Sequence, residues 1–351
     1  MECLFLQDLS LYNSAIFSSD GSVLVGRIYK EGEGYKGLLI DEEKGFAYLL
    51  GLGNREDIGL YSVKRCGDNY ISVGHWKDRL FVVFYHGVEE NIKSFIGPKG
   101  ILWQTDCYLA VGGYRGKGWH LFLLKVQEAT GRAYSSGEHI YAYSLAKEAK
   151  GYVVVGRVGK EGDYDGFILT VDDRLRPKRL LRTGWRENDY LRYVEGGWAV
   201  GRMEVEGDSE GLVVELGNLS LSLYKRPGFD YFRFIYPEKG LIFGEGEEVI
   251  RKALFVAKGK GLLVGDGFSA VRYYNKDSQS AYGYLYVGAY AYALKIRGFP
   301  EGSRVSYTIR PLSITWQGLR LYPLKDKLNL KPLSVGFSKV SYLWKRCDYL
   351  H

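Results

Sequence analysis

Short apolar runs, each close to a glycine, recur along this chain. In residues 151–171 two such runs, 153–155 and 167–171, are rich in Val, Ile, Leu and Phe and are separated by glycine and aspartate. Runs of β-branched and aromatic residues favour strands, whereas Gly and Asp tolerate the positive φ angles of tight turns. Residues 151–171 are therefore predicted to form a β-hairpin.

The same pattern appears at seven places, where an apolar run ends in a marker glycine. The steps between these glycines are 38–48 residues, and the seven positions are Gly26, Gly74, Gly112, Gly156, Gly201, Gly244 and Gly288. A strand-based repeat of about 40–50 residues indicates small sheets that bury their faces against neighbouring copies. The repeat units are expected at about residues 14–50, 58–96, 100–136, 140–183, 190–225, 231–264 and 269–310.

Three of the predicted turns, 31–37, 161–166 and 206–211, are near copies, and each follows an arginine: Arg27, Arg157 and Arg202. This arrangement resembles the tandem-repeat β-propeller proteins of bacteria and archaea, in which a Gly-Tyr-Val-Val-Gly-like strand precedes a Gly-rich turn. The resemblance implies an all-β propeller of seven blades, each a four-stranded antiparallel sheet. The alternative is six blades plus a small C-terminal β extension. Propellers serve many functions, so the resemblance implies no activity.

The C-terminal part differs from the repeats in its charge. From Arg304 onward the chain has nine Lys or Arg and two acids, a difference that equals the net charge of +7 of the whole chain. Residues 1–310 are expected to form the propeller, and residues 311–351 a basic β extension that packs on the ring or closes it. The binding residues expected in this extension are Arg320, Lys325, Lys327, Lys331, Lys339, Lys345 and Arg346.

Such a local excess of positive charge attracts polyanions or acidic protein surfaces. The expected partners are therefore a protein, or a nucleic acid or other polyanion that meets the C-terminal extension. In the alternative interpretation, the basic residues are scattered over a solvated surface or face acids elsewhere on the ring, because alternation along a strand spreads neighbouring charges over two faces.

Closure of a ring would bring the two chain ends together, and with them Cys3 and Cys347. Cys66 and Cys107 precede the marker strands of the second and third units, so they also are expected to lie on neighbouring units. Two disulfides, Cys3–Cys347 and Cys66–Cys107, are predicted on this basis. The alternative is four buried, unbonded cysteines that pack as small hydrophobic residues.

The composition bears on source and location. Lys, Arg and Glu are abundant, whereas Met (2) and His (5) are scarce, which is typical of proteins that work at high temperature. A thermophilic, archaeal source is expected, and intracellular proteins of hyperthermophiles do contain disulfides. The first residues lack the basic and apolar regions of a secretion signal, and no apolar run is long enough to span a membrane. A cytoplasmic protein is expected.

Two motifs suggest chemistry that the pattern does not support. Gly32, Gly34 and Gly37 match the Gly-x-Gly-x-x-Gly of dinucleotide-binding loops, but a strand follows them where that motif requires a helix, so a hairpin turn is predicted.

The histidines occupy different positions in their units and are not expected to form one metal or catalytic site: His75, His86, His120, His139 and His351.

The acidic turns offer hard oxygen ligands in Asp163, Asp165, Asp208 and Glu210, but without the spacing of a calcium-binding loop. They are interpreted as solvated turn residues or as partners of the arginines that follow the marker glycines. No metal and no cofactor is expected.

Arginine alternates with aromatic residues at 192–193, 231–234 and 272–274. These side chains could stack on bases or sugars, but alternation along a strand favours packing between units. The function expected overall is non-enzymatic: a binding scaffold that engages a protein or polyanionic partner. The alternative is an enzyme of hydrolase or lyase type with its site in the central channel. Such a site requires inward-pointing acids and histidines, which the repeat pattern does not predict.

Overall fold

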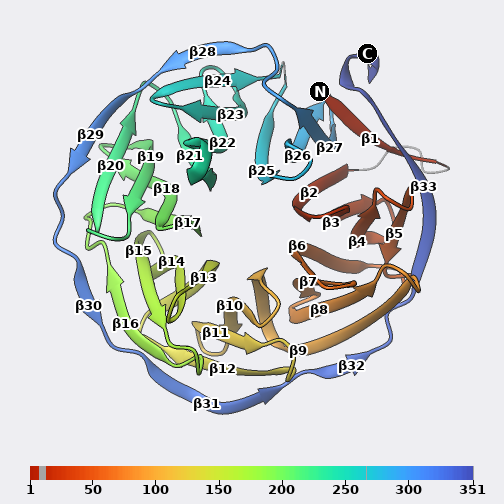
Figure 1. Ribbon diagram of the computed structural model, residues 1–351, viewed down its shortest axis with the longest axis horizontal. Coiled ribbons are helices and arrows are strands. Elements are labelled where there is room, and N and C mark those ends of the chain that lie inside the picture. Colours follow the sequence, from red (N-terminus) through yellow and green to blue (C-terminus); the bar gives the residue numbers. More distant parts are fainter. Residues whose placement is uncertain (8–12, 266, 351) are drawn as a thin grey trace.

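The strands of this protein lie in seven groups around a common centre, and a C-terminal segment runs along the circumference (Figure 1). A computed structural model describes residues 1–7, 13–265 and 267–350, with the side chains of 325, 326, 349 and 350 excepted. In the described part of the chain, no helix has the length and apolar character needed to cross a membrane.

The first three groups contain eleven strands in chain order. Group one comprises β2 (Asn13–Asp20), β3 (Val23–Lys30), β4 (Gly34–Asp41) and β5 (Phe46–Leu50). Groups two and three comprise β6 (Glu56–Cys66), β7 (Asn69–Trp76), β8 (Arg79–His86), β9 (Asn91–Thr105), β10 (Leu109–Arg115), β11 (Trp119–Lys125) and β12 (Thr130–Ser135). The long strand β9 belongs to both, because its first half pairs with β8 and its second half with β10.

Groups four to six are regular. Group four comprises β13 (His139–Glu148), β14 (Gly151–Lys160), β15 (Asp163–Val171) and β16 (Pro177–Arg182). Group five comprises β17 (Asp189–Glu195), β18 (Trp198–Val205), β19 (Asp208–Glu215) and β20 (Ser220–Lys225). Group six comprises β21 (Asp230–Tyr236), the 3-10 turn η1 (Pro237–Lys239), β22 (Leu241–Glu247), β23 (Arg251–Ala257) and β24 (Lys260–Val264). The hairpin predicted for residues 151–171 is confirmed by the antiparallel pairing of β14 with β15.

Group seven combines the two ends of the chain. It comprises β25 (Ser269–Asn275), β26 (Ser280–Val287), β27 (Tyr290–Arg297) and the N-terminal strand β1 (Glu2–Leu6), which pairs with β27. Within the described residues, seven clusters of buried hydrophobic side chains form the core, and each lies between two neighbouring groups. Each group therefore depends on its neighbours to cover its faces.

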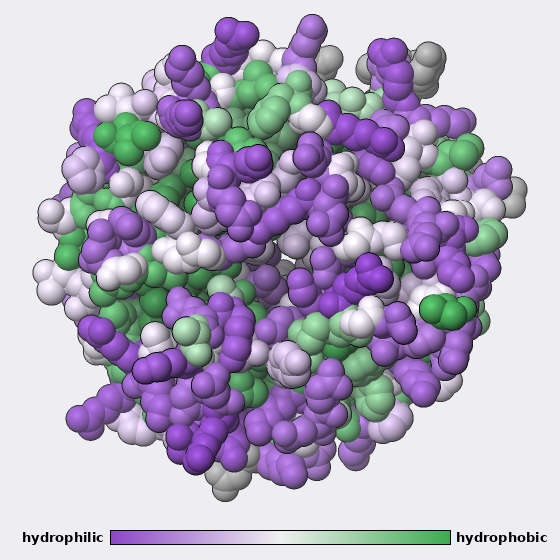
Figure 2. Space-filling model, viewed as in Figure 1, coloured by the Kyte–Doolittle hydropathy of each residue, from purple (hydrophilic) through white to green (hydrophobic). Residues whose placement is uncertain are grey.

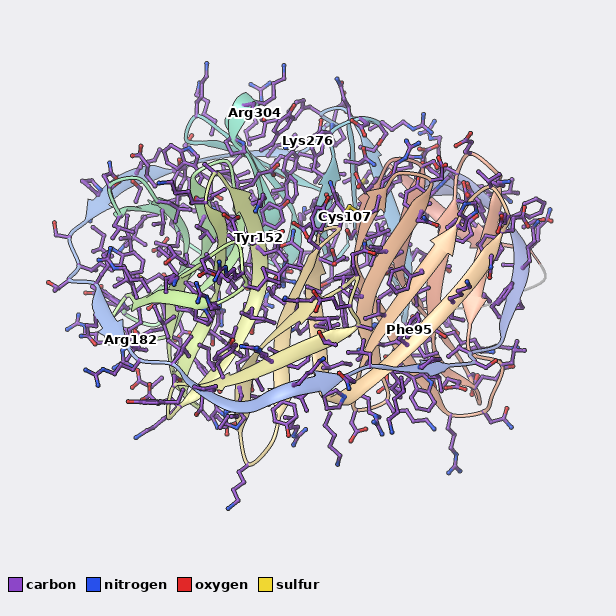
Figure 3. The ribbon with its side chains drawn as sticks, turned by 60° about the horizontal axis from the view of Figure 1, so that its bottom comes forward. Phe95, Cys107, Tyr152, Arg182, Lys276 and Arg304 are labelled. Atoms are coloured by element: carbon purple, nitrogen blue, oxygen red, sulfur yellow. A yellow bond between two sulfur atoms is a disulfide. The ribbon has the colours of Figure 1, made fainter. Side chains whose placement is uncertain are left out.

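The C-terminal residues 303–346, which we call the outer segment, add a further strand to successive groups. The segment contains β28 (Ser303–Ser306), β29 (Thr308–Leu312), β30 (Gln317–Leu319), β31 (Tyr322–Asn329), β32 (Lys331–Leu333) and β33 (Phe337–Arg346), followed by the 3-10 turn η2 (Cys347–Leu350). These strands pair in turn with β24, β20, β16, β12, β9 and β5. Figure 3 shows the segment passing Arg182 and Phe95 at the edge of the molecule.

The predicted fold class, a propeller of seven separate four-stranded antiparallel blades, is wrong, and so is the alternative with six blades. Within the described residues, the hydrogen-bonded strands form one 18-stranded sheet and three five-stranded sheets, and none of these closes on itself. The large sheet is mixed, because β4 and β6 pair in parallel. The four-stranded units lose their separate identity because the outer segment bonds to their edges and β9 serves two groups. This segment begins at Ser303, ahead of the boundary expected between residues 310 and 311.

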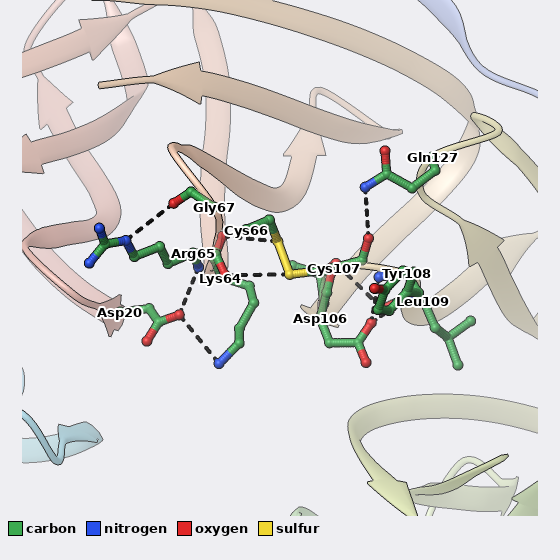
Figure 4. The surroundings of a disulfide bond; sticks show 11 residues. Asp20, Lys64, Arg65, Cys66, Gly67, Asp106, Cys107, Tyr108, Leu109 and Gln127 are labelled. Atoms are coloured by element: carbon green, nitrogen blue, oxygen red, sulfur yellow. Dashed lines mark hydrogen bonds and ion pairs between the residues drawn. A yellow bond between two sulfur atoms is a disulfide. The ribbon is translucent and has the colours of Figure 1, made fainter. Parts of the chain in front are cut away.

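Both expected cysteine pairs are present as disulfides. Cys3 in β1 is bonded to Cys347, which directly follows β33, so the bond fastens the end of the outer segment to the N-terminal strand. Cys66 at the end of β6 is bonded to Cys107 in the loop between β9 and β10 (Figure 4). Asp20 of group one accepts a hydrogen bond from the backbone N–H of Arg65 at 2.7 Å beside this second disulfide. Groups one, two and three are therefore tied together at one place.

Six of the seven predicted marker glycines share one structural role. Each pairs with the residue just before a register shift in the innermost strand of its group. A Cβ atom added to the glycine would collide with a backbone oxygen of that strand. The seventh assignment, Gly288, is wrong. Gly283 holds that position in β26, facing the backbone oxygen of Ala270, whereas Gly288 lies in a turn with φ of 61°.

A buried carboxyl links groups four and five. Asp189 is fully buried; its Oδ1 accepts a hydrogen bond from the backbone N–H of Gly166, and its Oδ2 lies 2.8 Å from the hydroxyl of Thr183. Burial raises the pKa of Asp189 well above its usual value, and the neighbouring Asp165 carboxyl raises it further. The fold therefore favours the protonated form of Asp189.

Asp189→Asn is expected to make the protein more stable above neutral pH and less sensitive to pH. Because the folded-state pKa of Asp189 is raised, the stability contributed by its protonated form is fully present below the unfolded-state pKa. This stability is lost as pH rises through the folded-state pKa. Asparagine keeps the acceptor for Gly166 and does not ionise. Urea denaturation between pH 4 and pH 9 measures the effect, with the exposed Asp173→Asn as control. Parallel pH profiles for wild type and Asp189→Asn would contradict the prediction.

Candidate functional site

The innermost strand of each group contains a β-bulge, which leaves one residue without a partner on the neighbouring strand. The pairing shifts by one residue opposite or next to the first six marker glycines, and opposite Gly283 in group seven. A bulge re-aims its extra residue, and here these residues line one cavity at the centre of the molecule. We call them the central ring: Phe17, Tyr61, Trp103, Tyr143, Arg192, Arg233 and Arg272.

The central ring has an aromatic arc, formed by groups one to four. The ring centroids of Phe17 and Tyr61 lie 5.3 Å apart, those of Tyr61 and Trp103 4.6 Å apart, and those of Trp103 and Tyr143 5.6 Å apart. These separations are typical of tilted and edge-to-face aromatic pairs. The four side chains therefore form a continuous apolar wall on one side of the centre.

Arginines from groups five to seven complete the ring, and we call them the arginine arc: Arg192, Arg233 and Arg272. The guanidinium of Arg192 lies 5.0 Å from the ring centroid of Tyr143, and that of Arg272 lies 5.2 Å from the centroid of Phe17. Cation–π contacts thus join both ends of the aromatic arc to the arginines. Figure 2 shows hydrophilic side chains gathered around the centre of the face drawn in Figure 1.

Only part of this positive charge is neutralised. Arg233 forms an ion pair with Glu245 at 2.8 Å, and the side chain of Glu245 is 3% exposed. Within the described residues, Arg192 and Arg272 form no ion pair with an acid, so three guanidinium groups and one carboxylate leave two positive charges at the centre. Nε of Arg233 is buried without a hydrogen-bond acceptor, so this arginine keeps an unused donor.

The pKa values reflect this crowding of cations. Burial, together with the nearby Arg233 guanidinium, lowers the pKa of Arg272 to about 10. Burial also lowers the pKa of Arg192. Burial acts in the same direction on Arg233, but the Glu245 carboxylate outweighs it and raises its pKa. All three arginines remain charged at neutral pH, and an anion placed among them would relieve their mutual repulsion.

The residue after each bulge differs between the two arcs. In the aromatic arc it is Ser or Gln, and it accepts a hydrogen bond from a backbone N–H of the next group: Ser18 from Val63, Ser62 from Thr105, Gln104 from Leu145 and Ser144 from Val194. In the arginine arc it is aromatic: the rings of Tyr193 and Phe234 are tilted with centroids 4.4 Å apart, and those of Phe234 and Tyr273 meet edge-to-face at 4.9 Å. Both arrangements hold neighbouring groups together and fix the direction of the bulged side chains.

The central cavity is small. Its volume is about 40 Å³. One water needs about 10–15 Å³, so the cavity has room for roughly three waters or one small oxyanion. The serine hydroxyls in its wall are engaged by backbone N–H groups. Among the described lining residues there is no His or Cys and no carboxylate.

The basic residues expected from the sequence lie elsewhere. Arg320, Lys327, Lys331, Lys339, Lys345 and Arg346 are exposed along the outer segment, whereas the side chain of Lys325 lies outside the described residues. They follow β30 to β33 around the circumference instead of meeting at one patch. Lys339 pairs with Glu90 at 2.8 Å, and the Lys345 ammonium lies 5.3 Å from the centroid of the Phe5 ring. Binding of a polyanion by these residues stays a prediction.

The arginines after the marker glycines have different surroundings from those expected. Arg157 lies 4.4 Å from the ring centroid of Tyr164 and 4.7 Å from that of Tyr141, and no described acid forms an ion pair with it. Arg202 pairs with Glu204 at 3.6 Å. The acid Asp165 instead lies 3.4 Å from Arg182. The prediction that Arg157 and Arg202 pair with acids of the three similar turns is therefore wrong. Tyrosine rings occupy the space around Arg157, and Arg202 pairs with an acid of its own strand. No group of three metal-ligating side chains occurs among the described residues.

The residues of the central ring include the arginines of three sequence stretches for which strand alternation favours packing. Arg192, Arg233 and Arg272 are the arginines of the three Arg–aromatic stretches. The bulged residue lies 9–13 residues before the glycine that pairs beside it, so aligning the units on these glycines does not superpose the bulged residues. In the structure, this position is aromatic in four groups and arginine in three.

Comparisons with known proteins do not assign this chain to a family. No protein-family model matches it. A stretch of 62 residues is 31% identical to an uncharacterized protein of Aquifex aeolicus (strain VF5), and the match spans 18% of this chain and 18% of that protein. A match of this length leaves the rest of both proteins uncompared, so the geometry of the central ring is the main guide to function.

Proposed function

We propose that this chain is a non-enzymatic binding protein whose central ring receives an anionic group of its partner. The observation that carries the proposal is the convergence of Arg192, Arg233 and Arg272 with one carboxylate, Glu245, to balance them. Guanidinium groups bind carboxylate and phosphate oxygens through paired, charge-assisted hydrogen bonds. The described lining residues of the cavity include no His, Cys or carboxylate, so binding without turnover fits the site better than hydrolase or lyase chemistry.

The proposal also includes the partner that the sequence predicts. A protein partner, or a polyanion that follows the outer segment, would meet basic residues spread along the circumference, which suits a partner that wraps around the edge. The thermophilic, archaeal source and the cytoplasmic location stay predictions. The two disulfides are compatible with an oxidising compartment and also with the interior of a hyperthermophile.

Arg192→Gln is expected to weaken the binding of inorganic phosphate by tenfold or more. A hydrogen bond to a charged group contributes about 1.5–3 kcal/mol, and Arg192 has no acid partner to keep its charge occupied. Isothermal titration of phosphate and of sulfate at low ionic strength measures the change, because salt screens the attraction.

The matched control is Arg310→Gln, which removes an exposed arginine of the outer segment. It should leave phosphate affinity unchanged, and circular dichroism should show both variants folded. Absence of phosphate and sulfate binding to the wild type at millimolar concentration would refute the proposed function. Equal affinity of wild type and Arg192→Gln would also refute it.

A further inference from the structure

A second cavity adjoins the central ring between groups one and seven. It shares Phe17 and Arg272 with the central cavity and has a volume of about 200 Å³, against about 40 Å³ at the centre on the same measure. The other side chains that matter here are Arg27 in β3, Tyr35 in β4, and Tyr284 and Tyr286 in β26. We call this space the side cavity.

The side cavity is cationic and contains no acid among its described lining residues. The Arg27 guanidinium lies 4.4 Å from the ring centroid of Tyr35, and that of Arg272 lies 5.9 Å from the centroid of Tyr284. Neither arginine forms an ion pair in the described part of the chain. The positive charge of the central ring therefore continues into the side cavity through Arg272.

The walls of the side cavity are aromatic. Tyr284 and Tyr286 are mutually perpendicular, with ring centroids 6.0 Å apart, and Phe17 forms the boundary with the centre. Flat aromatic side chains together with arginine planes are surfaces on which the rings of bases stack. The centre has room for an oxyanion but not for such a ring, whereas the side cavity has room for one.

We propose that the side cavity binds the planar ring of a phosphate ester of the nucleoside monophosphate class, whose phosphate lies at Arg272 and the central ring. This inference rests on the proposed function, because the central ring must first accept the anion. It adds that the anion is attached to a ring, and that Tyr35 and Tyr284 recognise that ring.

The test compares three probes by isothermal titration on the folded wild type: inorganic phosphate, adenosine and adenosine monophosphate. Adenosine monophosphate should bind at least about tenfold more tightly than phosphate, because stacking on an aromatic side chain adds affinity for a base. Adenosine should bind more weakly than its monophosphate, because it lacks the group that the arginines hold.

Two variants separate the ring contact from the anion contact. Tyr35→Leu and Tyr284→Leu should each lower the affinity for adenosine monophosphate toward that of phosphate and leave phosphate binding unchanged. Tyr108→Leu, which alters a tyrosine that is 66% exposed in the loop before β10, is the matched control and should change neither.

The outcomes distinguish the two proposals. If phosphate and adenosine monophosphate bind the wild type equally, the side cavity does not recognise the ring, and the inference is overturned while the proposed function stands. If adenosine binds as tightly as its monophosphate, the inference is also overturned. If neither phosphate nor the ester binds, the proposed function fails first. The wild-type comparison gives this answer even if one tyrosine variant does not fold.

Discussion

Replacing both Cys3 and Cys347 with alanine is expected to lower the free energy of unfolding by about 2–4 kcal/mol. The disulfide joins residues 344 positions apart and fastens the end of the outer segment to β1. Without it the unfolded chain regains the conformational freedom that the cross-link removes. The end of β33 also loses its covalent tie to group seven. Urea denaturation of oxidised protein measures the loss.

The second disulfide provides a matched control within the same chain. Cys66 and Cys107 are 41 positions apart, so their replacement by alanine is expected to cost about 2 kcal/mol less, because the entropy of a closed loop grows with the logarithm of its length. Equal losses for the two pairs would contradict this account. Detection of four free thiols in oxidised, denatured protein would remove its basis.

The sequence predicts the local structure of the groups well. The runs at 153–155 and 167–171 lie in β14 and β15, and the turn at Gly32 and Gly34 joins β3 to β4 with φ angles of 78° and 82°. These features depend on residues close together in the chain, such as apolar runs and glycines with positive φ. Local pattern is sufficient for them.

The organisation of the sheets could not be predicted in the same way. The pairing of β30 with β16 and of β33 with β5 joins residues that are far apart in the chain. The outer segment has short strands with mixed exposure, and nothing in its local pattern specifies which edges it covers. The prediction of separate four-stranded blades fails here, because it treats the outer strand of each group as an edge.

Local pattern does not reveal the central ring either. Arg192, Arg233 and Arg272 lie in strands where alternation would place every second residue in the core. A bulge adds one residue and changes the direction of the side chains at that point, so strict alternation gives the wrong face. The glycines of the neighbouring strand mark these bulges, since Gly201, Gly244 and Gly283 each pair with the residue just before one.

Gly201→Ala is expected to destabilise the protein by about 3 kcal/mol and also to weaken phosphate binding. Gly201 is paired with Leu191, and a Cβ atom at this position would lie far inside van der Waals contact with the backbone oxygen of Tyr190. Because the backbone of β18 fixes the position of the Cβ atom and the oxygen belongs to the backbone of β17, the collision cannot be relieved by a change of rotamer. The innermost strand must move, and it carries Arg192.

Gly217→Ala is the matched control, because a Cβ atom at Gly217 would meet nothing within 4 Å. It should leave both stability and phosphate affinity close to those of the wild type. Urea denaturation and phosphate titration of the two variants test the link between the glycine, the bulge and the site. If Gly201→Ala lowers stability while phosphate affinity stays unchanged, the bulge does not position Arg192 for binding. If it leaves stability unchanged, the close approach of β17 and β18 at this glycine does not constrain the fold.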